Sequence, residues 1–165
     1  VAVPLLGQAH GLLQQFVPTV AEQVVLFHLG FNLCLAVLFI GLSWLPLTFA
    51  LYAGQSAAYA MTGIHWLGRA PAHALFIGFF GSVLVAMVTR VTQGHSGQPL
   101  VMPAAAWWAF AGVQVVAMVR VAAELADDPM GWMACAAIGW LLAFAPWVAR
   151  LGRIYLSPRT DGKPG

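Results

Sequence analysis

The chain has 165 residues, of which 61% are hydrophobic and 7% are charged, and its formal net charge is +2. Soluble domains carry about 25% charged residues, so this composition cannot cover a globule with polar surface and excludes an ordinary water-soluble domain. The small net charge also provides no basic surface for nucleic acid, and we expect no nucleic-acid partner. The lipid bilayer is therefore the expected solvent and the first expected partner.

The N-terminal part of the sequence contains an irregular stretch followed by a long apolar one. Residues 1–23 hold two prolines and two glycines, which predicts an interfacial or irregular segment. Residues 24–62 would reach about 58 Å as one helix, which is too long for a single upright crossing. We expect two spans, 24–41 and 45–62, with a break near Gly41 and Pro46; one long tilted or kinked helix is the alternative.

Three further apolar segments follow, and each is about as long as one membrane crossing. They cover residues 72–91, 103–123 and 130–149. The predicted fold is an all-α, polytopic transmembrane helix bundle of four to five spans, forming a single integral membrane domain over residues 1–165.

The distribution of charge predicts the orientation of the bundle. Four basic residues follow the last span, whereas an acidic connector precedes it: Arg150, Arg153, Arg159 and Lys163 against Glu124, Asp127 and Asp128. Because cytoplasmic loops carry excess Lys and Arg, the C-terminal tail is expected in the cytoplasm. Six tryptophans lie near predicted span ends, as in interfacial aromatic belts: Trp44, Trp66, Trp107, Trp108, Trp132 and Trp147.

Two histidines flank the span 72–91. His73 opens it and His95 follows it, with Arg90 in its last turn, about 25 Å along a helix from His73. The two imidazoles cannot share one metal, but each could be one axial ligand of a haem whose second ligand comes from another helix. Arg90 could extend to the lipid headgroups or clamp an anion such as a haem propionate.

Other polar and small residues have simpler interpretations. Arg120 and Glu124, one helical turn apart, are expected to form an ion pair. Gly78, Gly81 and Ser82 share or adjoin one helix face, where they would allow a neighbouring helix to approach closely. The connector "TRVTQGHSGQPL", residues 89–100, is rich in hydrogen-bonding groups. Its "GHSG" backbone offers amides that could bind an anion, or it could be a plain interfacial turn.

The segment "LGRAPAHALFIGFFGSVLVAMVTRVTQGHSGQPL", residues 67–100, resembles the signature region of the NnrS family. The matching elements are "HAL", "MVTR", "GHSG" and "PL", in that order, and "PRTDGKPG" at 158–165 is similar to the end of that family. The family consists of bacterial polytopic membrane proteins associated with haem and copper and with resistance to nitric oxide. The resemblance covers about residues 45–165 and corresponds to the C-terminal part of family members.

The resemblance implies a site, a location and a role. The matched polar positions are His73, Arg90 and His95, so His73 and His95 become expected metal ligands and Arg90 an expected cofactor-binding residue. Haem is the implied cofactor and copper a second one. The implied setting is the bacterial inner membrane and the nitric-oxide or nitrosative-stress response, with no claim of catalytic turnover. A non-catalytic structural subunit of a larger membrane complex is the alternative, and other membrane subunits or self-association would then provide partners.

Overall fold

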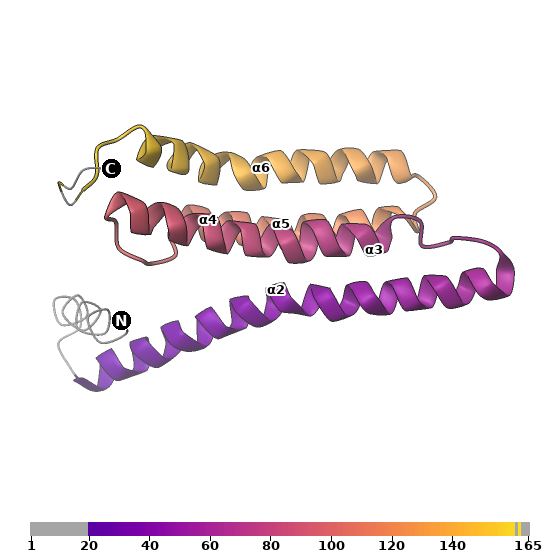
Figure 1. Cartoon of the computed structure of the whole chain (residues 1–165), viewed down its shortest axis with the longest axis horizontal. Coiled ribbons are helices and arrows are strands. Elements are labelled where there is room, and N and C mark those ends of the chain that lie inside the picture. The colour runs from indigo at the N-terminus through magenta and orange to yellow at the C-terminus, as the bar shows by residue number, and fades with distance from the viewer. Residues whose placement is uncertain (1–19, 161, 163–165) are drawn as a thin grey trace. The chain divides into compact units, whose positions relative to one another are not determined.

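The structure is a computed structural model that describes residues 20–160 and residue 162, although several side chains between residues 20 and 38 are not described. These residues form helices and no strands, which confirms the predicted all-α class. The elements in chain order are α2 (Val20–Thr62), α3 (Ala70–His73), the π-helix η1 (Ala74–Phe80), α4 (Gly81–Ser96), α5 (Ala104–Ala123) and α6 (Pro129–Tyr155), as labelled in Figure 1. The chain divides into two units, residues 1–40 and 41–165.

The sequence predicted an irregular segment over residues 1–23 and a single membrane domain over residues 1–165. Residues 1–19, where an irregular segment was expected, lie outside the described residues, whereas 20–23 already belong to α2. The assignment of residues 1–165 to a single membrane domain stays a prediction. The second unit begins at Gly41 and contains the end of α2 and all later helices.

The predicted break near residues 41–46 is wrong. Helix α2 is continuous over 43 residues, with Pro46 inside it. A proline removes one backbone hydrogen bond, whereas ending a helix exposes several unpaired backbone groups, which lipid cannot satisfy. The surrounding residues also favour the helix, because the Thr48 hydroxyl donates a 2.7 Å hydrogen bond to the Trp44 carbonyl one turn earlier. The single long helix, kept as the alternative, is therefore what the chain forms.

The three later spans are confirmed as helices. The elements α3, η1 and α4 join into one apolar helix of 27 residues, Ala70–Ser96, which contains the predicted span 72–91. Helices α5 and α6 match the other two spans, and α6 continues beyond the predicted end at residue 149 to Tyr155. Within the described part of the chain, these three helices are long and apolar enough to cross a membrane.

Small residues set the close packing of α5 against its neighbours. A methyl group added at Gly112 would collide with Ala143 of α6, and one added at Gly81 would lie 3.0 Å from Val113. Gly81 therefore acts as the sequence predicted for a small residue at a helix contact, and Gly112 does the same without having been predicted. Outward-facing residues such as Leu141 and Phe76 are 68% and 62% exposed, which suits contact with lipid.

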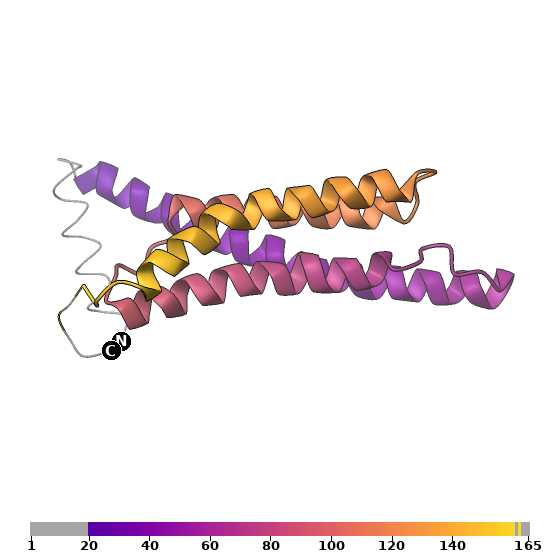
Figure 2. The same ribbon diagram turned by 90° about the horizontal axis from the view of Figure 1, so that it is seen from above.

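Hydrogen bonds between side chains connect the helices as well. The Trp147 indole of α6 donates to the Thr89 hydroxyl of α4 at 2.8 Å, and Thr92 lies 2.8 Å from the Tyr155 hydroxyl. Figure 2 shows α4 and α6 converging toward the ends that carry these two bonds. The predicted aromatic belt is wrong for Trp147 and Trp44, which are 4% and 8% exposed, because their indole nitrogens are needed inside the bundle.

Candidate functional site

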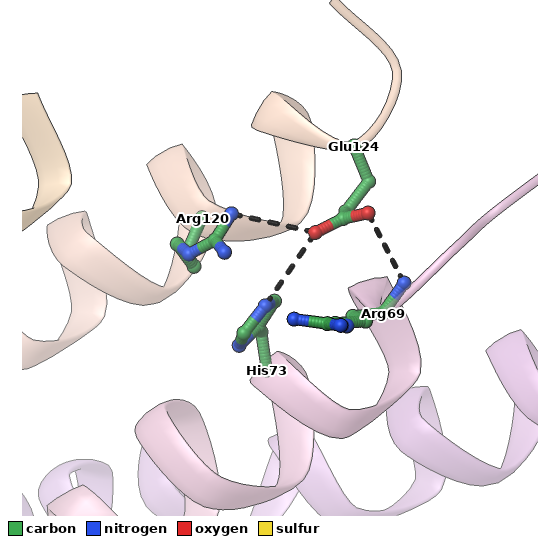
Figure 3. Close-up of polar contacts among 4 residues, drawn as sticks. All are labelled: Arg69, His73, Arg120 and Glu124. Carbon is green, nitrogen blue, oxygen red and sulfur yellow. Dashed lines mark hydrogen bonds and ion pairs between the residues drawn. The ribbon is translucent and has the colours of Figure 1, made fainter. Parts of the chain in front are cut away.

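A cluster of charged side chains lies where the Ala70–Ser96 helix begins and α5 ends (Figure 3). One oxygen of Glu124, Oε1, is 3.5 Å from His73 Nε2 and 3.4 Å from a guanidinium nitrogen of Arg120. The other oxygen, Oε2, accepts a 3.2 Å hydrogen bond from the backbone amide of Arg69. Both oxygens of this carboxylate are therefore used to join two segments that are far apart in sequence. We call these four residues the Glu124 cluster.

The loop before α3 is shaped to reach Glu124. Gly68 has φ +48, a left-handed conformation that side chains disfavour, and a Cβ at this position would collide with the Glu124 carboxylate. Pro71 then occupies the first turn of α3, where its missing N–H costs nothing. The sequence "LGRAPAH" thus combines a glycine for close approach with a proline that starts the helix.

The charges of the cluster are largely enclosed. The side chains of Glu124, Arg120 and His73 are 13%, 15% and 20% exposed. The Arg120–Glu124 pair confirms the ion pair predicted from the i, i+4 spacing. The sequence did not predict that Glu124 would also face His73, because the two residues belong to different helices. The one feature of the sequence that could have indicated this contact is Glu124 itself, a carboxylate at the end of an apolar segment.

The imidazole of His73 is held in an unusual way. Its Nε2 atom is buried and makes no hydrogen bond, because the 3.5 Å approach to Glu124 does not meet hydrogen-bond geometry. The other ring nitrogen points away from Glu124 (Figure 3). Metal-ligating histidines are commonly oriented by a hydrogen bond from one ring nitrogen to a carboxylate. In His73 the carboxylate of Glu124 faces Nε2 at 3.5 Å without such a bond, and the other nitrogen is directed away.

His95 and Arg90 lie far from this cluster. His95 is exposed in the last turn of α4, and Arg90 is an exposed residue of the same helix. His73 and His95 are near opposite ends of one continuous helix, about 33 Å apart at 1.5 Å per residue. The structure therefore brings neither His95 nor Arg90 close to His73. The roles of His73 and His95 as metal ligands, and of Arg90 as a cofactor-binding residue, stay predictions.

The "GHSG" connector does not offer the free amides that the sequence suggested. Gly97 has φ +72 and ends α4, and the backbone amides of Gly97 and Gln98 both donate to the Gln93 carbonyl. This is how a left-handed glycine satisfies the last carbonyls of a helix. The Gln93 side chain in turn donates to the Val101 carbonyl at 2.7 Å. Many of the connector's hydrogen-bonding groups therefore bond to one another within the turn. This agrees with the interpretation of the connector as a plain turn.

A second polar group, unpredicted from the sequence, lies within the bundle. Gln114 of α5 accepts a 2.6 Å hydrogen bond from the Trp44 indole and donates a 2.8 Å bond to the Ser82 hydroxyl. The Ser82 hydroxyl in turn donates a 2.6 Å hydrogen bond to the carbonyl of Gly78, a residue of η1. The Trp44 ring lies directly against Gly78. Each bond has a neutral partner, so the group joins helices and offers no charge to a ligand.

The donor set limits which metal the chain alone could hold. The side chains that the structure describes include no group of three or more His, Cys, Asp or Glu placed to bind a metal ion. A copper site built from three such ligands is therefore not formed by this part of the chain. A haem needs only one or two axial ligands, and His73, with one ring nitrogen facing a carboxylate and the other directed away, fits one such position.

Comparison with known proteins gives one match. The family model described as "NnrS protein" matches residues 24–159. No curated protein and no solved structure matches the chain. The match begins earlier than the resemblance seen from residue 45, and it includes only the start of "PRTDGKPG". Because the match covers most of the 165 residues, the chain belongs to the NnrS family.

Proposed function

We propose that this NnrS-family membrane protein is associated with haem and acts in the nitric-oxide or nitrosative-stress response, with His73 as an axial ligand. Family membership supports the class of protein, and the Glu124 cluster supports the residue. The observation that carries the proposal is a histidine whose ring faces a carboxylate 3.5 Å away, between two helices long enough to cross a membrane. Nothing observed favours the alternative of a purely structural subunit.

The residues of the cluster would act by positioning. Glu124 faces Nε2 at 3.5 Å, and a slight approach of the two groups would form the hydrogen bond that orients a ligating imidazole, with the other nitrogen directed away from Glu124. Arg120 and the Arg69 amide hold Glu124 in turn. Haem iron bound there would supply the coordination position for nitric oxide.

His95 and Arg90 belong to a weaker part of the proposal. An exposed imidazole at the end of α4 could ligate a separate haem near the other membrane face. Arg90 is five residues from His95, which places the two side chains about 140° apart around the helix. A single haem plane could not readily use both residues, so we give His73 the primary role. Copper has no comparable support in the described residues.

The proposed setting is the bacterial inner membrane with the C-terminal tail in the cytoplasm. Arg150, Arg153 and Arg159 lie at or beyond the last turns of α6, whereas Glu124 and Asp128 lie at the opposite end of this helix region. Asp128 caps the start of α6 by accepting from the Gly131 amide at 3.2 Å. The basic end is the one expected to face the cytoplasm.

Haem content per chain tests the proposal. The full chain is purified in detergent after expression with a haem supply, and its haem is extracted and quantified beside the visible spectrum. We expect haem in the unaltered protein, its loss in His73→Ala and its retention in His65→Ala. His65 is a matched control because it is an exposed loop residue stacked on Tyr59. Absence of haem from the unaltered chain, or equal loss in both variants, rejects the role of His73. A separate loss in His95→Ala would support a second site.

A further inference from the structure

A cavity of about 330 Å³ lies at the end of the bundle opposite the Glu124 cluster. It is lined by the last turn of α4, the connector after it, the last turns of α6 and the tail, including Ser96, Gln98, Arg150, Arg153, Ser157 and Thr160. Figure 2 shows the converging ends of α4 and α6 between which it lies. It is distinct from the proposed haem site, and the inference below does not depend on that proposal.

Specific contacts build this cavity from distant parts of the sequence. The tail folds back onto α4, where the backbone amide and the hydroxyl of Thr160 both donate to the Ser96 carbonyl, at 3.1 and 3.2 Å. Arg150 donates to the Gln98 side-chain oxygen at 3.2 Å. The Ser157 hydroxyl donates to the Arg153 carbonyl at 2.7 Å and thereby closes the end of α6. The cavity walls are thus fixed by hydrogen bonds from three segments.

Among the described residues that line the cavity, Arg150 and Arg153 carry positive charge and none is acidic. The two arginines are three residues apart and lie on the same side of α6. Neither takes part in the ion pairs found among the described side chains. The partner of Arg150 is a neutral amide, so that bond does not cancel its charge.

The position of the cavity suits a phosphate group. It lies where two membrane helices end, which is the depth of the lipid headgroups. Guanidinium groups match the geometry of phosphate oxygens and are used where a phosphate is bound by a fork of donors. Basic pockets between transmembrane helices on the cytoplasmic side are known to bind anionic headgroups. The two arginines disfavour a purely apolar ligand, and Ile154 and Pro158 give the cavity an apolar part as well.

We infer that this cavity binds a phosphate group, with Arg150 and Arg153 as its two cationic contacts. The phosphate could belong to an anionic lipid headgroup or be free in solution. Both sources present the same oxygens to the arginines, and the experiment distinguishes them.

The test measures phosphate binding to the full, detergent-purified chain after removal of bound lipid. Phosphatidylglycerol is added and its retention is titrated by native mass spectrometry, with zwitterionic phosphatidylcholine, whose phosphate charge is balanced by choline, as the comparison of zero net charge. Inorganic phosphate is titrated separately by calorimetry. Each arginine–phosphate contact is worth about tenfold in affinity, so Arg153→Gln should weaken binding about tenfold and Arg150→Gln/Arg153→Gln by more. Selective retention of phosphatidylglycerol identifies a lipid site, whereas binding of inorganic phosphate alone identifies a solute site.

Matched variants keep the test decisive. Arg69→Gln removes the same charge from an exposed side chain at the opposite end of the bundle, where the residue contacts Glu124 through its backbone amide, and it should bind phosphate as the unaltered chain does. Arg153→Gln leaves the Arg150–Gln98 bond intact, so it remains informative if the double variant does not fold. The inference is overturned if neither probe distinguishes the unaltered chain from the cavity variants. It is also overturned if Arg69→Gln loses as much affinity, because binding then reflects general surface charge.

Discussion

The indole nitrogen of Trp44 donates a 2.6 Å hydrogen bond to the side-chain oxygen of Gln114, which joins α2 to α5 inside the apolar bundle. Gln114 passes the connection on to Ser82 through its amide nitrogen. Hydrogen bonds between membrane helices contribute about 0.6 kcal/mol on average and up to about 1.7 kcal/mol. The pair therefore supplies a measurable part of the contact between these helices.

Replacing Gln114 by Leu should lower the free energy of unfolding by about 1–2 kcal/mol, because the Trp44 indole and the Ser82 hydroxyl both lose a partner. A double-mutant cycle of Gln114→Leu with Trp44→Phe, measured by reversible unfolding in mixed micelles, isolates the shared bond. We expect a coupling energy of about 0.6–1.7 kcal/mol. Strict additivity of the two substitutions would show that the bond contributes nothing.

Gly78→Ala should destabilise the bundle by about 1–3 kcal/mol, because the added methyl group would overlap the Trp44 ring. Gly152→Ala is the matched control, since its added methyl group meets open space within α6. That change should be neutral or stabilising by about 0.5–1 kcal/mol, as expected for alanine in a helix. Thermal unfolding of both variants measures the difference. Equal effects would contradict the packing of Trp44 on Gly78.

Gly68→Ala should disrupt the Glu124 cluster, because the new Cβ would collide with the Glu124 carboxylate. Gly63→Ala provides the control, since Gly63 also has a positive φ of 70° but has open space around it. Both variants incur the backbone strain of about 1–3 kcal/mol, and only Gly68→Ala adds the collision. The free energy of unfolding should therefore fall further for Gly68→Ala. If the free energy of unfolding fell equally in the two variants, Glu124 would not lie against Gly68.

Glu124→Gln should affect both the fold and the proposed haem. Because the side chains of Arg120 and Glu124 are 15% and 13% exposed, the change leaves a largely enclosed cation without its partner, and the free energy of unfolding should fall by about 1–3 kcal/mol. The orientation of His73 would weaken, and haem affinity should fall about 10–100-fold, as for other residues behind a metal ligand. Haem titration followed by absorbance measures the change. Asp127→Asn, an exposed acidic position of the same connector, should leave the affinity unchanged.

The sequence predicted the helices well because apolar length is a local property. Residues 72–91, 103–123 and 130–149 needed only hydropathy and helix rise, and Arg120 and Glu124 needed only helical spacing. The break near Pro46 was wrong because proline is a weaker interruption where lipid penalises unpaired backbone groups. Rules derived from soluble proteins therefore overestimate how readily a proline ends a helix in a membrane.

The site could be predicted only in part because its contacts join distant positions. His73 was selected from the family motif, but its partner Glu124 lies 51 positions later, and no spacing rule connects them. Trp44 and Trp147 were expected at the membrane surface, yet each lies inside because a hydroxyl or an amide on another helix accepts its N–H. The cavity beside Arg150 likewise depends on the return of the tail to Ser96.

The most direct test of the central claim, that His73 ligates haem, is chemical rescue of a His73→Gly variant. The visible spectrum of the haem-supplied, detergent-purified variant is recorded before and after addition of imidazole, beside the unaltered chain and His65→Gly. The account predicts that His73→Gly loses the haem bands of the unaltered protein, that imidazole restores them, and that His65→Gly keeps them throughout. A His73→Gly spectrum that matches the unaltered protein without imidazole would contradict the account.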